Sequence, residues 1–201
     1  MTDAKSHADD TRGGASCASV ETVIAETRDW IEKAVIGLNL CPFAQAVYVS
    51  ERIRYRVSEA QSAEALLGDL AGELRALQSA DPHAVETTLL IHPRALDDFL
   101  EYNQFLGAAD ATLVRLGLEG VLQIASFHPR YRFAGTGDDD IENYTNRSPY
   151  PMLHLLREAS VERAVAAAAD PAEIYERNIA TLRRLGRQGW RALWRANSGE
   201  E

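Results

Sequence analysis

His92 and His128 have the clearest chemical potential in this chain, because each follows a predicted β-strand directly and precedes a proline. Glu59 stands just behind a third predicted strand. Imidazole and carboxylate together bind zinc or iron, and imidazole also exchanges a proton near neutral pH. In an open α/β sheet, ligands bind outside the carboxyl ends of the strands, and neighbouring strands lie only ~4.8 Å apart.

We therefore expect these three side chains to face one cleft at the sheet edge. They would serve there as ligands of a divalent metal, Zn or Fe, or His92 and His128 would act as a catalytic acid–base pair. A third interpretation stays open, in which each imidazole only hydrogen-bonds a loop carbonyl.

A polar segment, residues 126–158, begins beside His128 and has few core-forming residues before Met152. Three of its four arginines, Arg130, Arg132 and Arg147, suit bidentate binding of carboxylate or phosphate. They predict a small anionic ligand, which Tyr131, Tyr144 and Asn146 would orient. The alternative is that the arginines pair with the acidic residues of the same segment, Asp138, Asp139, Asp140 and Glu142.

His154 lies at the end of this segment, where Pro149 and Pro151 suggest a helix beginning at Met152. One interpretation places His154 on an exposed helix face that it shares with Arg157 and Glu158. The other directs it back to the cleft as a third catalytic histidine.

The elements that would position these residues are predicted from hydrophobic spacing. Residues 1–19 are polar and rich in small residues, which is typical of a disordered tail, and residues 20–201 form a single globular α/β domain. The predicted elements are a helix from Val20 to Leu38, strands 52–57, 87–91 and 121–127, and helices 62–77, 96–116, 152–168 and 170–185, with a short final piece around Trp190 and Trp194. This β-α-β-α-β order predicts a small three-stranded, largely parallel sheet with right-handed crossovers.

Charge and composition narrow the class of protein. The formal net charge is −9, from 30 acidic and 21 basic residues, which disfavours nucleic acid and anionic membrane surfaces as partners. No apolar run approaches the ~20 residues of a membrane span, and the N-terminus has no apolar secretory region. We expect a cytoplasmic protein. Two cysteines without a CxxC pair disfavour a thiolate zinc site, and Cys41, after a helix and before a proline, fits a buried structural thiol.

Three stretches together resemble one protein family. They are the opening TxxWIEKAVIGLN, the turn NLCPFA and the long run SFHPRYRFAGTGDDDIENYTNRSPYPMLHLLRE. On these motifs the chain resembles the DUF1415 family from Val20 to Trp194. The resemblance implies a bacterial family of unknown function, and it supplies no catalytic residues.

The residues thus predict an enzyme that acts on a small anionic metabolite at the strand ends. The first alternative is a non-catalytic module that binds such an anion. The second is a partner-binding protein with an exposed apolar patch around Trp190 and Trp194. Oligomeric state stays open.

Overall fold

The structure is a computed structural model that describes residues 18–167 and 171–194. The predicted disordered tail, residues 1–19, lies almost entirely outside the described residues. The elements follow one another as α1 (Val20–Trp30), a π-helical turn η1 (Ile31–Ile36), α2 (Ala44–Val49), β1 (Ile53–Val57), α3 (Ala63–Ser79), β2 (Thr87–Ile91), α4 (Phe99–Arg115), β3 (Leu122–Phe127), a 3₁₀ helix η2 (Ile141–Thr145), β4 (Met152–Arg157), α5 (Glu158–Ala167) and α6 (Pro171–Ala192).

The sheet has four strands in the order β1-β2-β4-β3. β1 pairs with β2 in parallel, whereas β4 pairs antiparallel with both β2 and β3. The three predicted strands therefore do run in the same direction. The prediction of three strands, largely parallel, is nevertheless wrong, because β4 lies between β2 and β3 and makes two of the three pairings antiparallel.

The missed strand is Met152–Arg157, which was expected to begin a helix. Its two faces are both apolar, with Met152 in one core and Leu153 and Leu155 in the other. A short run that is apolar on both faces cannot be told from a buried helix by periodicity. The helix starts only at Glu158, and the Arg157 side chain turns to α3, where it bonds the carbonyl oxygens of Leu77 and Ala80 at 2.7 and 2.8 Å.

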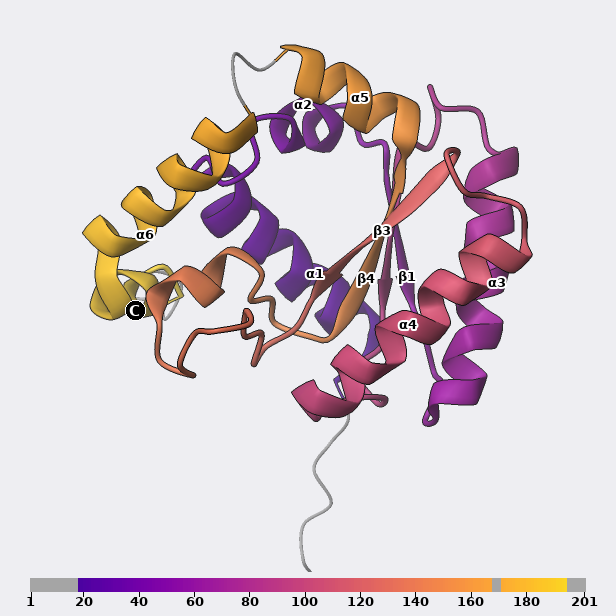
Figure 1. The fold of residues 1–201 in the computed structure, drawn as a ribbon, viewed down its shortest axis with the longest axis horizontal. Helices are drawn as coiled ribbons and strands as arrows, with labels where there is room; N and C mark the ends of the chain where they lie inside the picture. The colour runs from indigo at the N-terminus through magenta and orange to yellow at the C-terminus, as the bar shows by residue number, and fades with distance from the viewer. Residues whose placement is uncertain (1–17, 168–170, 195–201) are drawn as a thin grey trace, which may run out of the picture.

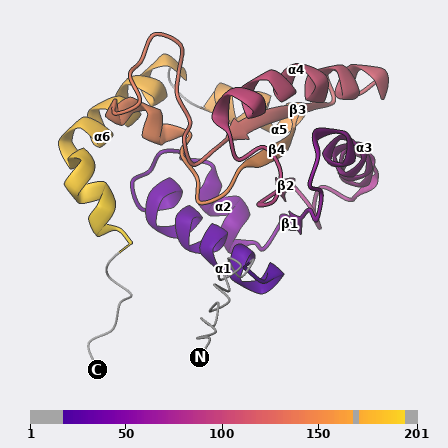
Figure 2. The ribbon, with the colours of Figure 1, turned by 90° about the horizontal axis from the view of Figure 1, so that it is seen from below.

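Helices cover both faces of the sheet (Figures 1 and 2). α3 and α4 enclose a core with Leu90, Leu153 and Tyr102 on one face. On the other face, α1, η1 and the end of α6 enclose a second core that includes Trp30 and Met152. Sheets with helices on both faces are a common way to bury strands that are apolar on both sides.

The end of α6 matches the predicted division into a helix and a short final piece. Gly186 interrupts the helix with φ +65° and ψ 173°. Trp190 beyond it is buried and packs against Tyr144 with ring centroids 5.1 Å apart, and Trp194 is half-buried. The exposed apolar patch predicted around the two tryptophans is therefore not present. Among the described residues, no helix has the length and apolar character needed to cross a bilayer.

Candidate functional site

The carboxyl ends of β1, β2 and β3 lie at one edge of the sheet, as predicted, with the start of β4 between two of them. His92 follows β2 and His128 follows β3. Both imidazole rings pack against the Tyr102 ring of α4, at centroid distances of 5.8 and 5.0 Å. The two histidines thus belong to one buried cluster and not to the open cleft that was expected, and β4 lies between the two strands that carry them.

His128 has both ring nitrogens engaged. Its Nδ1 accepts a hydrogen bond from the backbone N–H of Arg130 at 3.0 Å, so Nε2 carries the proton and donates to the carbonyl of Leu96 at 3.1 Å. The imidazole is buried, and burial is the main reason that its pKa is lowered. It is therefore neutral at pH 7, with no lone pair left for a metal.

His92 is fully buried, and burial lowers its pKa to about 4. Its Nδ1 lies 2.9 Å from the carbonyl oxygen of Ala95, and in a neutral ring this contact makes Nδ1 the donor. The other nitrogen, Nε2, is buried without a hydrogen-bond partner among the described residues.

The two histidines hold consecutive carbonyls, of Ala95 and Leu96, in the loop between β2 and α4. Leu96 has φ +58°, a left-handed conformation that is uncommon for leucine. The interpretation that each imidazole bonds a loop carbonyl is confirmed. Both side chains position the loop that leads into α4, and acid–base catalysis by them stays a prediction.

The predicted metal site lacks a convergent ligand set. Glu59 is exposed and pairs with Arg94 at 2.5 Å. Within the described part of the chain, no three His, Cys, Asp or Glu side chains lie close enough together to hold a metal ion. The geometry does not support zinc or iron bound by His92, His128 and Glu59.

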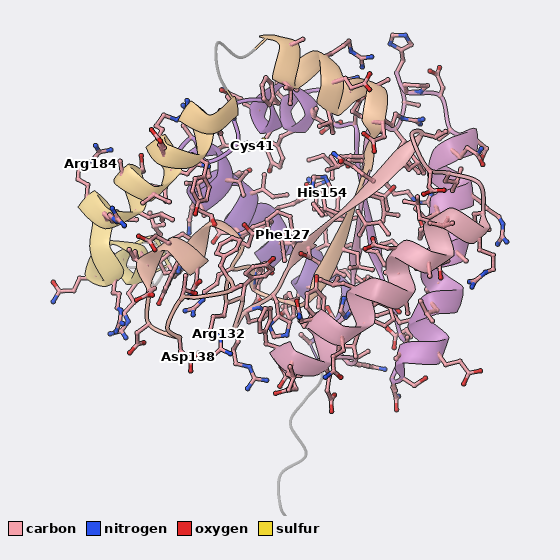
Figure 3. All side chains as sticks on the ribbon, in the orientation of Figure 1. Cys41, Phe127, Arg132, Asp138, His154 and Arg184 are labelled. Carbon is pink, nitrogen blue, oxygen red and sulfur yellow. The ribbon has the colours of Figure 1, made fainter. Side chains whose placement is uncertain are left out.

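His154 lies on the other face of the sheet. Tyr102 and the two clustered histidines are on the α4 side, whereas His154 faces the α1 side, where its ring lies 6.2 Å from that of Phe127 (Figure 3). Both interpretations made from the sequence fail, because His154 is in a central strand. It shares neither a helix face with Arg157 nor a cleft with His128.

The three predicted arginines do come together. They line a surface groove of about 860 Å³ between the start of α4 and the polar segment. We call it the arginine groove; its lining is Asp98, Phe99, Leu100, Asn103, Arg130, Arg132, Phe133, Ala134, Gly135, Thr136, Asp138 and Arg147. Leu100 is 64% exposed, so the groove also offers apolar surface.

Two of these arginines pair with exposed carboxylates. Arg130 lies 3.1 Å from Asp97, and Arg132 lies 2.8 Å from Asp138, the neighbour shown in Figure 3. The alternative that arginines pair within the polar segment is thus confirmed for Arg132. Such exposed pairs are weak, so either guanidinium can exchange its partner for a ligand.

Arg147 differs from the other two arginines. Its guanidinium donates to the carbonyls of Tyr131 and Asp138, at 3.3 and 2.5 Å, and lies 4.3 Å above the Tyr144 ring. It has no carboxylate within ion-pair distance among the described residues. A half-buried cation without a counter-charge therefore faces the groove.

The other predicted binding residues are Tyr131, Tyr144 and Asn146, and none of them lines the groove. Their contacts instead hold the polar segment in position. The Tyr131 ring packs between Phe99 and Phe133, at 5.2 and 5.0 Å. Asn146 donates its amide to the carbonyl of Ser126 at 3.0 Å, and Tyr144 packs on Trp190 as described above.

The sequence analysis assigned no role to Asp98, which lines the groove, or to Asn143, which supports the polar segment. Asp98 caps α4 by accepting from the N–H groups of Leu100 and Glu101, at 2.9 and 3.1 Å. An aspartate before an apolar helix is a known start signal, and it would have placed the start of α4 at this edge. Asn143 is buried and bonds Phe133 N and the carbonyl of Gly137 at 3.0 and 2.8 Å; no local pattern indicates this role.

Comparison with known proteins adds a family. The model of the family described as "Protein of unknown function (DUF1415)" matches residues 22–192. The chain belongs to the DUF1415 family. Neither a curated protein nor a solved structure shows significant similarity to this DUF1415 protein. The family assignment predicted from the sequence is confirmed.

Proposed function

We propose that this DUF1415 protein binds a small anionic molecule, through a carboxylate or phosphate group, in the arginine groove. The observation that carries the proposal is Arg147, whose charge faces the groove and has no carboxylate partner among the described residues. Guanidinium groups match carboxylate and phosphate in both charge and geometry.

The number of arginines supports an anionic ligand. Three arginines line the groove of a protein with net charge −9, and the aspartates beside them, Asp97 and Asp138, form only exposed pairs with Arg130 and Arg132. Arg130 and Arg132 sit on the rim of the groove with side chains 58% and 52% exposed. An anion can therefore bind these two arginines at little cost in free energy.

Binding without catalysis is better supported than an enzyme. His92 and His128 are not part of the groove lining, and three of their four ring nitrogens already bond the protein backbone. The groove itself contains no histidine. We retain an enzyme that acts on the same anion, with these histidines as acid–base groups, as the second candidate.

The test is calorimetric titration of the protein with inorganic phosphate and with citrate. We expect Arg147→Met to weaken binding about tenfold or more, because a charge-assisted hydrogen bond contributes about 1.5–3 kcal/mol. Raising the salt concentration should weaken binding to the unmodified protein as well.

Arg184→Met is the matched control. Arg184 is exposed on α6 and points away from the groove (Figure 3). Like Arg147→Met, this substitution removes one positive charge. The affinity for phosphate and citrate should stay within about twofold, because a distant exposed charge is screened. Equal losses in the two variants, or no binding of either anion to the unmodified protein, would refute the proposal.

A further inference from the structure

His154 is held in one orientation by Thr87. The Thr87 hydroxyl donates its only proton to the carbonyl of Leu155 at 2.6 Å. It must therefore accept from the imidazole, whose Nε2 lies 2.7 Å away. This bond assigns the proton of neutral His154 to Nε2 and makes Nδ1 a hydrogen-bond acceptor.

That acceptor is unused, and it is not completely buried. Nδ1 has no hydrogen-bond partner in the part of the chain that the structure describes, and it is absent from the atoms there that are both buried and unsatisfied. The His154 side chain is half-buried, although it stands in a central strand of the sheet. The helices therefore leave this side chain incompletely covered, and we call the uncovered area the opening.

The register of the sheet locates this opening over β3. Leu89 and Ala125 lie directly opposite His154 on the two neighbouring strands. Leu89 is 3% exposed, whereas Ala125 is half-buried and contributes only a methyl group. Around Ala125 the same face carries three more half-buried side chains, Gln123, Phe127 and Leu156. The surroundings of Nδ1 are thus mainly apolar, with one amide.

None of the side chains that surround His154 on this face, Leu89, Gln123, Ala125, Phe127 and Leu156, carries a charge. An ionised ligand would lose its hydration here and gain no counter-charge, which is costly. The chemistry is therefore opposite to that of the arginine groove.

We propose that His154, oriented by Thr87, forms with Ala125, Phe127 and Leu156 a second binding site, for a small uncharged molecule with an apolar body and a hydroxyl or amide donor. The ligand donates to Nδ1 and covers the half-buried side chains. This site lies on the α1 face of the sheet and does not depend on the proposed anion function.

Phenol is a suitable probe, because it has one hydroxyl donor on an apolar ring. We expect a saturable shift of the His154 Nδ1 resonance in nitrogen NMR spectra as phenol is added. Ala125→Leu should fill the opening and abolish the shift. Ala134→Leu, an equivalent change in the arginine groove, should leave the shift unaltered. Absence of a saturable shift in the unmodified protein, or an undiminished shift in Ala125→Leu, overturns the proposal.

Two further readouts separate loss of the site from loss of the fold. The imidazole resonances of His92 and His128 report on the buried cluster of the other face, and they should be unchanged in Ala125→Leu. Thr87→Val keeps the shape of the site but removes the hydroxyl that fixes the tautomer of His154. The imidazole proton should then no longer be confined to Nε2, and the phenol shift should be reduced at least severalfold. A Thr87→Val protein that responds to phenol like the unmodified chain contradicts the proposed orientation.

Discussion

At the scale of single residues, three histidines that look equivalent in the sequence have different roles. His128 bridges Arg130 and Leu96, His92 bonds Ala95, and His154 bonds Thr87. Their common property is the neutral form, since burial lowers the pKa of each of them.

This property predicts a pH dependence of stability. In the unfolded chain a histidine has a pKa of about 6.5, whereas His92 and His154 in the folded protein have a pKa of about 4. Between these values the unfolded chain binds more protons, so the stabilisation is fully present above pH ~6.5 and is lost as the pH falls towards 4. For His92 the loss is on the order of 3 kcal/mol. Urea unfolding between pH 7.5 and 4.5 measures it.

His154→Gln isolates one contribution from the general effect of acid. The glutamine amide can still donate to Thr87 but does not titrate. Its free energy of unfolding should therefore fall less steeply with decreasing pH. Parallel pH profiles for the variant and the unmodified protein would show that His154 is not a buried neutral imidazole.

At the scale of elements, glycine is required at two positions in helical segments, for different reasons. A Cβ at Gly37 would lie 2.4 Å from the carbonyl oxygen of Lys33, because the π-helical turn brings the chain very close at this point. Gly186 has open space around it, but its φ of +65° is unfavourable for other residues.

Alanine at these two positions should destabilise the protein for different reasons. We expect Gly186→Ala to lower the free energy of unfolding by about 1–3 kcal/mol, because φ +65° with ψ 173° is a backbone conformation almost confined to glycine. Gly37→Ala should lower it by about 2–3 kcal/mol, because a backbone contact must open. Chemical denaturation of both variants measures these losses. A Gly37→Ala protein as stable as the unmodified chain would contradict the close approach at the π-helical turn.

At the scale of the whole molecule, the polar segment connects the sheet edge to helices distant in the sequence. Figure 2 shows the segment that carries η2 beside α6. Trp30 of α1 donates its indole N–H to the carbonyl of Arg147 at 3.0 Å. The position of Arg147 in the groove thus depends on a residue 117 positions away.

Trp30→Phe should therefore weaken anion binding without any change in the groove lining. We expect a loss of severalfold in phosphate affinity, with a stability loss of about 1–2 kcal/mol from the missing hydrogen bond. Phe127→Leu removes the ring that packs on Trp30 at 5.4 Å and leaves the bond to Arg147 intact. Calorimetry should show weakened binding in Trp30→Phe alone; an equal loss in both variants would indicate a general loosening of the fold.

The local sequence pattern predicted several of the helices and strands. The alternation in β1, the leucine spacing of α3 and the apolar run of β2 each appear where the sequence placed them. Strand direction brought the ends of β2 and β3 to one edge, and Arg130, Arg132 and Arg147 line one groove. These inferences succeeded because each depends on the period of a single element or on chain direction.

Tertiary structure alone decided the rest. Residues 152–157 form a strand because pairing between β2 and β3 buries both of their apolar faces. The spacing of apolar residues within the segment cannot predict such a long-range pairing. That insertion turned His154 to the α1 face, away from His128. Likewise, only the packed loop shows that His92 and His128 bond carbonyls, and only the folded groove shows which of its arginines has no carboxylate partner among the described residues. The residue types determined what chemistry is possible here, and long-range packing determined which side chains meet to perform it.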